Sequence, residues 1–129
     1  MPAAASIKAL VVDDQQTIRS LVRNGLREIG LTDIREAVDG EDGLRSLLAS
    51  PVNLVISDYN MPKLDGLTFL RAVRTAPQLK GVGFIMLTGR ADNDLVQRAV
   101  QFGVNNYLVK PFTVATLRQK LEDVYGALT

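Results

Sequence analysis

Five short apolar runs divide the chain, and segments with helical spacing separate them. Four of the runs are rich in Val, Ile or Leu and too short for helices, as expected of strands buried on both faces of a sheet. The second run is more polar and alternates, which suits a strand at the edge of the sheet. The five predicted strands are Ile7–Val12, Asp33–Val38, Asn53–Ser57, Gly83–Leu87 and Asn106–Val109.

The intervening segments carry apolar stripes with the period of an α-helix. Asp65 and Thr113 are expected to cap two of these helices, because short polar side chains accept hydrogen bonds from the first free backbone N–H groups. The predicted helices follow Ile18–Ile29, Glu41–Ala49, Leu67–Val73, Leu95–Phe102 and Leu117–Leu128.

Strand and helix alternate five times along the chain. Parallel strands need crossover connections, so this alternation predicts an α/β fold in which helices cover both faces of a five-stranded parallel sheet. The predicted architecture is a three-layer α/β/α sandwich. With 129 residues we expect one domain over residues 1–129.

Composition narrows the chemistry, because the chain contains no His, Cys or Trp. Without Cys there is no disulfide, thiolate nucleophile or Cys-ligated metal. Without His there is no Ser-His-Asp triad and no usual transition-metal site. Any chemistry must therefore use carboxylates, hydroxyls, amines and hard metal ions.

The charge balance and hydropathy of the chain do not favour binding to nucleic acid or to a membrane. The 15 basic and 14 acidic residues nearly cancel, which gives no push towards nucleic acid or a membrane surface. The N-terminal segment lacks a basic signal-peptide region, and no apolar stretch is long enough to span a membrane. We expect a cytoplasmic monomer that binds neither DNA nor membrane.

Polar residues follow four of the five predicted strands, at the edge where open α/β sheets bind ligands. A single Asp in such a place is usually a turn former or a helix cap. Three carboxylates together repel one another unless a cation lies among them, and oxygen ligands favour Mg²⁺. The residues expected to meet there are Asp13, Asp14, Asp58, Thr88 and Lys110.

This combination suits phosphoryl transfer. A magnesium site of oxygen ligands keeps positions open for phosphate oxygens, while Lys110 offers a fixed positive charge and Thr88 a hydroxyl donor. Asp58 stands alone at the end of the central strand and is the best nucleophile. Its attack on phosphorus would give an aspartyl phosphate.

Four segments of the chain carry distinctive motifs: Leu10–Asp14, Ile56–Gly66, Met86–Gly89 and Val109–Phe112. They resemble the receiver domain of two-component response regulators, and above all its stand-alone chemotaxis members. The resemblance covers nearly the whole chain, from about Ile7 to Ala127, and the motifs match in kind, order and spacing. It implies the strand order 2-1-3-4-5.

The resemblance implies a role for each acidic residue. Asp58 matches the phosphoryl acceptor of the family, and Asp13 and Asp14 match the acidic pair that holds Mg²⁺. Asp58 and the backbone carbonyl of Asn60 would complete the protein ligands. The domain would catalyse only its own phosphorylation and dephosphorylation.

Further matches concern the switch. Thr88 and Lys110 match the hydroxyl and the lysine that contact the phosphoryl group, and Lys110–Pro111 matches a peptide bond that is cis in the family. Tyr107 matches an aromatic residue that turns inward on activation. We expect this movement to reshape the surface of the fourth helix, fifth strand and fifth helix.

The resemblance also implies partners. The phosphoryl group in this family comes from a phosphohistidine, and since this chain has no His, the donor must be another protein, a histidine kinase of the chemotaxis type. We expect no output domain after Thr129, and therefore expect the effect to pass to a protein such as the flagellar motor switch. A phosphate sink or a phosphorelay shuttle is the alternative.

Two residues depart from the chemotaxis pattern. Tyr59 stands where Trp is common, and Arg90 stands where an acidic residue is common, two positions beyond Thr88. The dephosphorylation rate and any auxiliary phosphatase are therefore open.

Other functions fit less well. A phosphatase of the haloacid dehalogenase type needs a second Asp where this chain has Asn60, and the acidic pair would repel the phosphate of a flavodoxin-type cofactor. Arg19, Arg23 and Arg27 align on one helix face. A solvated face is the expected interpretation, with a cyclic-dinucleotide surface as the alternative.

Overall fold

The computed structural model describes residues 3–61, 63–89 and 93–129. Its strands form one parallel sheet in the order β2-β1-β3-β4-β5, which confirms the predicted fold and strand order. Each strand begins and ends within one residue of its predicted bounds. The strands are β1 (Lys8–Val12), β2 (Asp33–Ala37), β3 (Leu54–Asp58), β4 (Gly83–Thr88) and β5 (Asn106–Val109).

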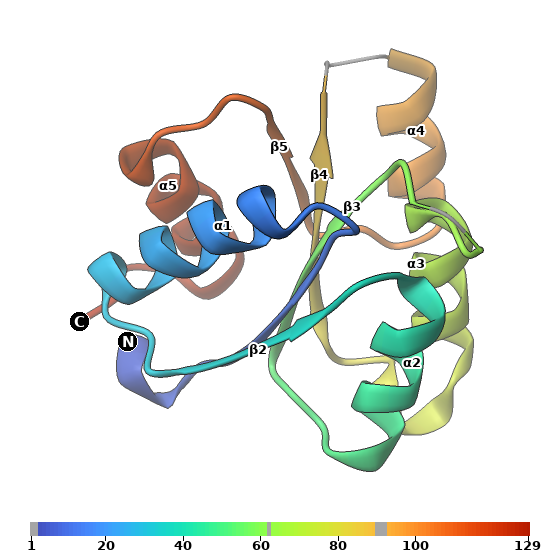
Figure 1. Cartoon of the computed structure of the whole chain (residues 1–129), viewed down its shortest axis with the longest axis horizontal. Coiled ribbons are helices and arrows are strands. Elements are labelled where there is room, and N and C mark those ends of the chain that lie inside the picture. The colour runs from blue at the N-terminus through green and yellow to red at the C-terminus, as the bar shows by residue number, and fades with distance from the viewer. Residues whose placement is uncertain (1–2, 62, 90–92) are drawn as a thin grey trace.

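Helices cover both faces of this sheet, as predicted (Figure 1). On one face lie α1 (Gln16–Ile29) and α5 (Val114–Tyr125), which contact each other. On the other lie α2 (Gly40–Ala49), α3 (Gly66–Thr75) and α4 (Asn93–Gln101). Two short 3-10 turns, Ala4–Ser6 and Pro77–Leu79, complete the elements.

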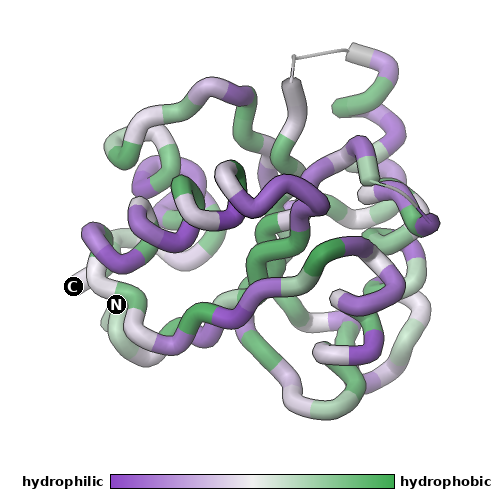
Figure 2. The backbone as a smooth tube through the Cα atoms, in the orientation of Figure 1, coloured by the Kyte–Doolittle hydropathy of each residue, from purple (hydrophilic) through white to green (hydrophobic). Residues whose placement is uncertain are grey.

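The core is divided by the sheet into two apolar clusters. Along β1, Ala9 and Val11 belong to the cluster under α1 and α5, whereas Leu10 and Val12 belong to the cluster under α2 and α3. This alternation follows from the two-residue period of a strand. The hydrophobic colour in Figure 2 is concentrated on the central strands accordingly.

The edge strand β2 differs from the central strands β3 and β4, as its polar sequence predicted. Only Ala37 of its five residues is buried, whereas all of β3 and β4 is buried. Polar side chains can therefore stand on β2 at the molecular surface, and Glu36 is one of them.

Helix starts bring backbone close to the carboxyl ends of the strands. Asp65 and Thr113 accept hydrogen bonds from the N–H groups of Thr68 and Thr116, which confirms both predicted caps. At the start of α3, a Cβ on Gly66 would come within 2.5 Å of the Asp58 carbonyl oxygen. Only glycine fits this close approach between α3 and the end of β3.

No helix in the described ranges has the length and apolar character needed to cross a membrane.

Candidate functional site

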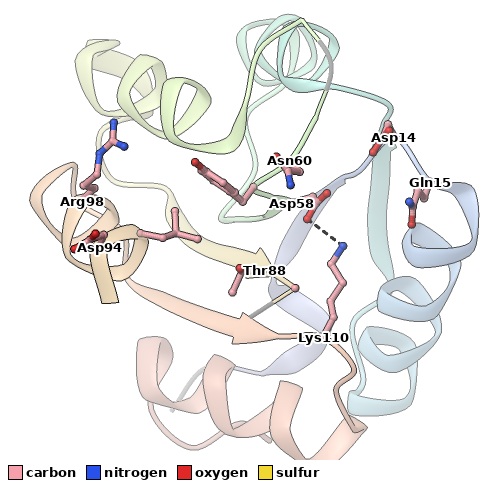
Figure 3. Close-up of a pocket in the computed structure, with 11 residues that line it drawn as sticks. Asp14, Gln15, Asp58, Asn60, Thr88, Asp94, Arg98 and Lys110 are labelled. Carbon is pink, nitrogen blue, oxygen red and sulfur yellow. Dashed lines mark ion pairs between the residues drawn. The ribbon is translucent and has the colours of Figure 1, made fainter. Parts of the chain in front are cut away.

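Side chains from the carboxyl ends of four strands meet at one edge of the sheet. Asp14 follows β1, Asp58 ends β3, Thr88 ends β4 and Lys110 follows β5, and all four line one cavity of about 900 Å³ (Figure 3). The sequence predicted that these four residues lie close together, because the carboxyl ends of parallel strands are on the same side of the sheet. Asn60 lines this cavity as well and lies beside Asp58 in Figure 3.

Three carboxylates form the centre of this site. Carboxylate oxygens of Asp13, Asp14 and Asp58 lie within 4.8 Å of one another. The pairing of β1 with β3 places Val12 opposite Ser57, so the residues that follow them are neighbours. Asp13 is fully buried and Asp58 nearly so, while Asp14 is exposed to solvent.

Lys110 is the cation closest to these carboxylates among the ion pairs of the described chain. Its Nζ atom lies 3.1 Å from Asp58 Oδ1 and 3.8 Å from Asp13 Oδ2. One ammonium group cannot neutralise three carboxylates, so the site carries an excess of negative charge. Such a cluster attracts a further cation.

The pKa values of the two buried acids, Asp13 and Asp58, are both raised. Burial raises the pKa of Asp13 to about 6, and the charges of Asp58 and Asp14 add to the effect against the attraction of Lys110. Burial also raises the pKa of Asp58, although Lys110 opposes the shift through its hydrogen bond and its charge. The positive charge and hydrogen-bond donors around these two carboxylates are therefore too few to offset the cost of burying their ionised forms.

The oxygens of Asp13 are used unequally. Oδ1 accepts a hydrogen bond of 2.9 Å from the backbone N–H of Gln15. Oδ2 is buried and has no hydrogen-bond partner among the residues that the structure describes. A buried oxygen without a donor, in a cluster of oxygen ligands, fits a hard divalent cation such as Mg²⁺.

The other two polar residues of the predicted site are held by the sheet. Thr88 is buried at the end of β4, and its carbonyl oxygen accepts a hydrogen bond of 2.8 Å from Lys110 N–H. This bond fixes the start of the Lys110 side chain beside β4. The Lys110–Pro111 peptide bond is cis.

Tyr107 lies on β5 and is half-buried against the apolar cluster under α2 and α3. The ammonium group of Lys120, on α5, lies 4.7 Å from the centre of its ring. This cation–π contact holds one face of the ring towards α5.

The structure adds groups that the sequence did not single out for this site. Asp94 and Arg98, both on α4, line the far end of the cavity (Figure 3). Their place in the α/β alternation, on the helix after β4, was the available signal. Arg90, which the sequence placed near the site, lies outside the described residues.

The arginine row on α1 is largely engaged with a single acidic residue. Arg19 Nε lies 3.1 Å from Glu36 Oε1, and Arg23 Nη1 lies 3.1 Å from Glu36 Oε2. Arg27 is exposed on the same helix. Two of the three guanidinium groups are therefore paired across to β2.

Comparison with known proteins agrees with this geometry. The family model described as "Response regulator receiver domain" matches residues 9–122. The chain is 50% identical over 128 residues to a probable chemotaxis protein CheY of Rhizobium etli, covering 99% of each chain. It is 39% identical over 123 residues to chemotaxis protein CheY-3 of Vibrio cholerae, covering 95% of each.

Solved structures show the same fold. Chemotaxis protein CheY4 of Vibrio cholerae superposes with a TM-score of 0.85 at 34% identity, covering 96% of this chain and 99% of that one. A putative response regulator from Chloroflexus aurantiacus gives a TM-score of 0.87 at 28% identity, covering 98% and 100%. The chain belongs to the response regulator receiver domain family, a family of signalling switches, and its relatives include chemotaxis proteins of the CheY type.

Proposed function

We propose that this protein is a chemotaxis response regulator that accepts a phosphoryl group on Asp58 from the phosphohistidine of a histidine kinase. The observation that carries the proposal is the setting of Asp58. Its buried carboxylate lies 3.1 Å from Lys110 Nζ and belongs to a three-carboxylate cluster. In this cluster Asp13 Oδ2 has no hydrogen-bond partner among the described residues.

The transfer is a substitution at phosphorus. An oxygen of the ionised Asp58 carboxylate forms a bond to phosphorus while the bond between phosphorus and the imidazole nitrogen of the donor histidine breaks. The other ring nitrogen of the phosphohistidine carries a proton in this step, so the leaving nitrogen keeps the electron pair of the broken bond and departs as part of a neutral imidazole. The products are an aspartyl phosphate on this chain and a free histidine on the kinase.

Asp13, Asp14, Asp58 and the backbone carbonyl of Asn60 would hold Mg²⁺. A bound magnesium ion supplies positive charge for the phosphoryl oxygens. Two observations support this assignment: Asp13 Oδ2 has no hydrogen-bond partner in the described part of the chain, and Asp14 lines an open cavity.

Lys110 and Thr88 would act on the phosphoryl group itself. Lys110 already neutralises Asp58 and lies where it can move its ammonium group to a phosphoryl oxygen. Thr88 lines the same cavity from β4 and would donate its hydroxyl proton to another of these oxygens. The added charge of about −1.5 to −2 would draw both side chains inward.

The signal would then spread to the surface formed by α4, β5 and α5. Movement of Thr88 displaces the end of β4, and Tyr107 on the neighbouring strand would turn into the space that opens. The cation–π contact with Lys120 would break in this movement. We infer that a flagellar motor switch protein binds the new surface, since the relatives are chemotaxis proteins.

A phosphate sink or a phosphorelay shuttle remains the second form of this proposal, because neither requires a motor contact. The cyclic-dinucleotide alternative has less support, because Arg19 and Arg23 are already paired with Glu36.

The phosphoryl-transfer proposal is tested with a radiolabelled histidine kinase of the chemotaxis type. Wild-type protein should take up label in the presence of Mg²⁺ and lose most uptake with EDTA. Asp58→Asn should take up none, because an amide is not a nucleophile for phosphorus. Equal labelling of wild type and Asp58→Asn would overturn the assignment.

The output is tested separately with a motor-switch peptide. Beryllofluoride, which mimics the acyl phosphate, should raise the affinity of wild type about 5–150-fold, as a coupling of ~1–3 kcal/mol requires. Asp58→Asn should show no increase. Unchanged affinity of phosphorylatable wild type would favour the sink or shuttle.

A further inference from the structure

The loop between β1 and α1 carries both acidic residues that precede the helix, and a long side chain from α1 folds back onto it. Arg19 Nη1 donates a hydrogen bond of 2.7 Å to the backbone carbonyl oxygen of Asp13. The Asp13 N–H donates to Ala37 O on β2 at 3.2 Å. Asp13 is therefore held through its backbone from two sides.

The Arg19 guanidinium is itself fixed. Its Nε donates to Glu36 Oε1 at 3.1 Å, and only 13% of its side chain is exposed. A planar guanidinium held at two edges cannot rotate without breaking one of the bonds. The Arg19 side chain thus forms a bridge from Glu36, on the edge strand, to the main chain of Asp13.

This bridge acts on the peptide that joins the two acidic residues. The Asp13 carbonyl belongs to the peptide plane between Asp13 and Asp14, and the orientation of that plane sets the direction in which the Asp14 side chain leaves the backbone. Asp13 Oδ1 is occupied by Gln15 N–H, which leaves Oδ2 directed to the cluster. The backbone bond from Arg19 therefore bears on the positions of both carboxylates.

Glu36 makes this arrangement electrically compatible with a cation. A free guanidinium at the Asp13 carbonyl would add a positive charge close to the place where a divalent ion would bind. The Glu36 carboxylate lies 3.1 Å from Arg19 and, because Arg23 contacts it at the same distance, it offsets part of this charge. Arg19 can thus hold the loop with a weaker repulsion of the metal than an unpaired guanidinium would cause.

We propose that Arg19, paired with Glu36, is a positioning residue for the divalent cation, which it serves by fixing the Asp13–Asp14 peptide through the Asp13 carbonyl. The inference rests on the proposed function, since it concerns the same cation site. Partners that orient metal ligands typically change metal affinity 10–100-fold when they are removed.

Arg23 provides a matched control in the same helix. It lies at the same distance of 3.1 Å from Glu36 but makes no hydrogen bond to the β1–α1 loop within the described residues. Its Nε is buried and also has no hydrogen-bond partner there. Arg19→Gln and Arg23→Gln each remove one charge and one ion pair to Glu36. Only Arg19→Gln removes the donor to Asp13.

The test is calorimetric titration of Mg²⁺ into the two variants and wild type, with no phosphodonor present. We expect Arg19→Gln to bind Mg²⁺ about 10-fold more weakly and Arg23→Gln to stay within about twofold of wild type. Arg19→Lys keeps the charge, but its single nitrogen cannot reach both Glu36 and Asp13, so we expect affinity at least about threefold below wild type.

Denaturant unfolding in EDTA separates positioning from simple loss of stability. Without metal, Arg19→Gln should lose more stability than Arg23→Gln, because it also loses the hydrogen bond to the Asp13 carbonyl. The positioning role is measured by the added stabilisation from Mg²⁺, which should be smaller for Arg19→Gln than for Arg23→Gln.

Two failures are distinguishable. Wild type without measurable Mg²⁺ affinity would overturn the proposed function. Wild type that binds Mg²⁺, with Arg19→Gln equal to Arg23→Gln, would overturn the role of Arg19 alone. If Arg19→Gln does not fold, wild-type affinity of Arg19→Lys overturns that role equally.

Discussion

Buried polar groups at the two ends of the sheet differ in how completely they are hydrogen-bonded. At the carboxyl end, Asp13, Asp14 and Asp58 crowd together, and one buried oxygen has no hydrogen-bond partner in the described chain. At the amino end, Arg74 and Tyr125 are also partly buried, but their polar atoms are bonded. Both ends belong to one sheet, so the scaffold does not impose this difference.

Arg74 shows how thorough the bonding at the amino end is. Its three nitrogen atoms make four hydrogen bonds, to the carbonyl oxygens of Gly103, Lys80 and Val82 and to the side-chain oxygen of Asn105. These acceptors lie in the segments that precede β4 and β5. The guanidinium ties both strand starts to the end of α3, and burial lowers its pKa.

The polar groups at the amino end stabilise the fold, whereas those at the carboxyl end are placed to bind a ligand. A buried polar group that is fully bonded contributes to stability, while one left incomplete costs free energy unless a ligand completes it. The bonded groups at the amino end thus stabilise the receiver domain. The incompletely bonded carboxylates at the carboxyl end lower its stability when no ligand is bound.

The largest effect is expected from Arg74→Met, which leaves four acceptors at the amino end without this donor. We expect a loss of about 3 kcal/mol in the free energy of unfolding, because several hydrogen bonds from one charged group disappear together. Urea unfolding of both proteins in EDTA measures the difference.

Magnesium affinity is the control for this variant. Arg74 lies at the opposite end of the sheet from the carboxylates, so folded Arg74→Met should bind Mg²⁺ as wild type does. A stability loss below about 1 kcal/mol, or a large loss of Mg²⁺ affinity, would contradict the division between the two ends.

At the carboxyl end, Asp13→Asn should change stability in the other direction. The amide keeps the shape of the side chain but removes a buried charge that Asp58 and Asp14 repel. We expect the protein in EDTA to gain on the order of 2 kcal/mol, since the charged form is the one penalised by burial. Urea unfolding with and without Mg²⁺ measures this.

The same variant should lose most of the stabilisation that Mg²⁺ gives to wild type, because Asp13 would be one of the ligands. Asp65→Asn is a matched control, since this Asp caps α3 and lies outside the cluster. Lower stability of Asp13→Asn in EDTA would show that the carboxylate stabilises the fold and is not held at a cost.

The sequence predicted the carboxyl end far better than the amino end. Asp13, Asp14, Asp58, Thr88 and Lys110 could be brought together because each follows a recognisable strand and parallel strands end at one edge. The buried strands and two helix caps were predictable for a similar reason, since their signals lie within a few neighbouring residues.

Arg74 and the Arg19–Glu36 pair could not be predicted in this way. Arg74 reads as an ordinary polar position near the end of an amphipathic helix, and its partner Asn105 is 31 residues away. Glu36 reads as a polar residue of an edge strand. Such contacts depend on side-chain lengths and on the packing of α1 beside β2, and no spacing in the sequence encodes them.

The smallest effect is expected from Tyr125→Phe at the amino end. The Tyr125 hydroxyl donates a hydrogen bond of 2.9 Å to Asn53 O, which also accepts one from Gly83 N–H. Because that carbonyl keeps one partner, we expect a loss of only about 1 kcal/mol at neutral pH.

The pH dependence of this loss gives the sharper test. Burial raises the pKa of Tyr125 to about 12 from an ordinary value of 10.0. The folded protein then holds the phenol proton more tightly than the unfolded chain, so this contribution is full below pH 10.0 and is lost as the pH rises through about 12. The stability gap between wild type and Tyr125→Phe should close over that range. Tyrosinate absorbance should show a step near pH 12 in wild type, and this step should be lost in Tyr125→Phe. An unchanged titration in Tyr125→Phe would show that Tyr125 is not one of the bonded, buried groups at the amino end.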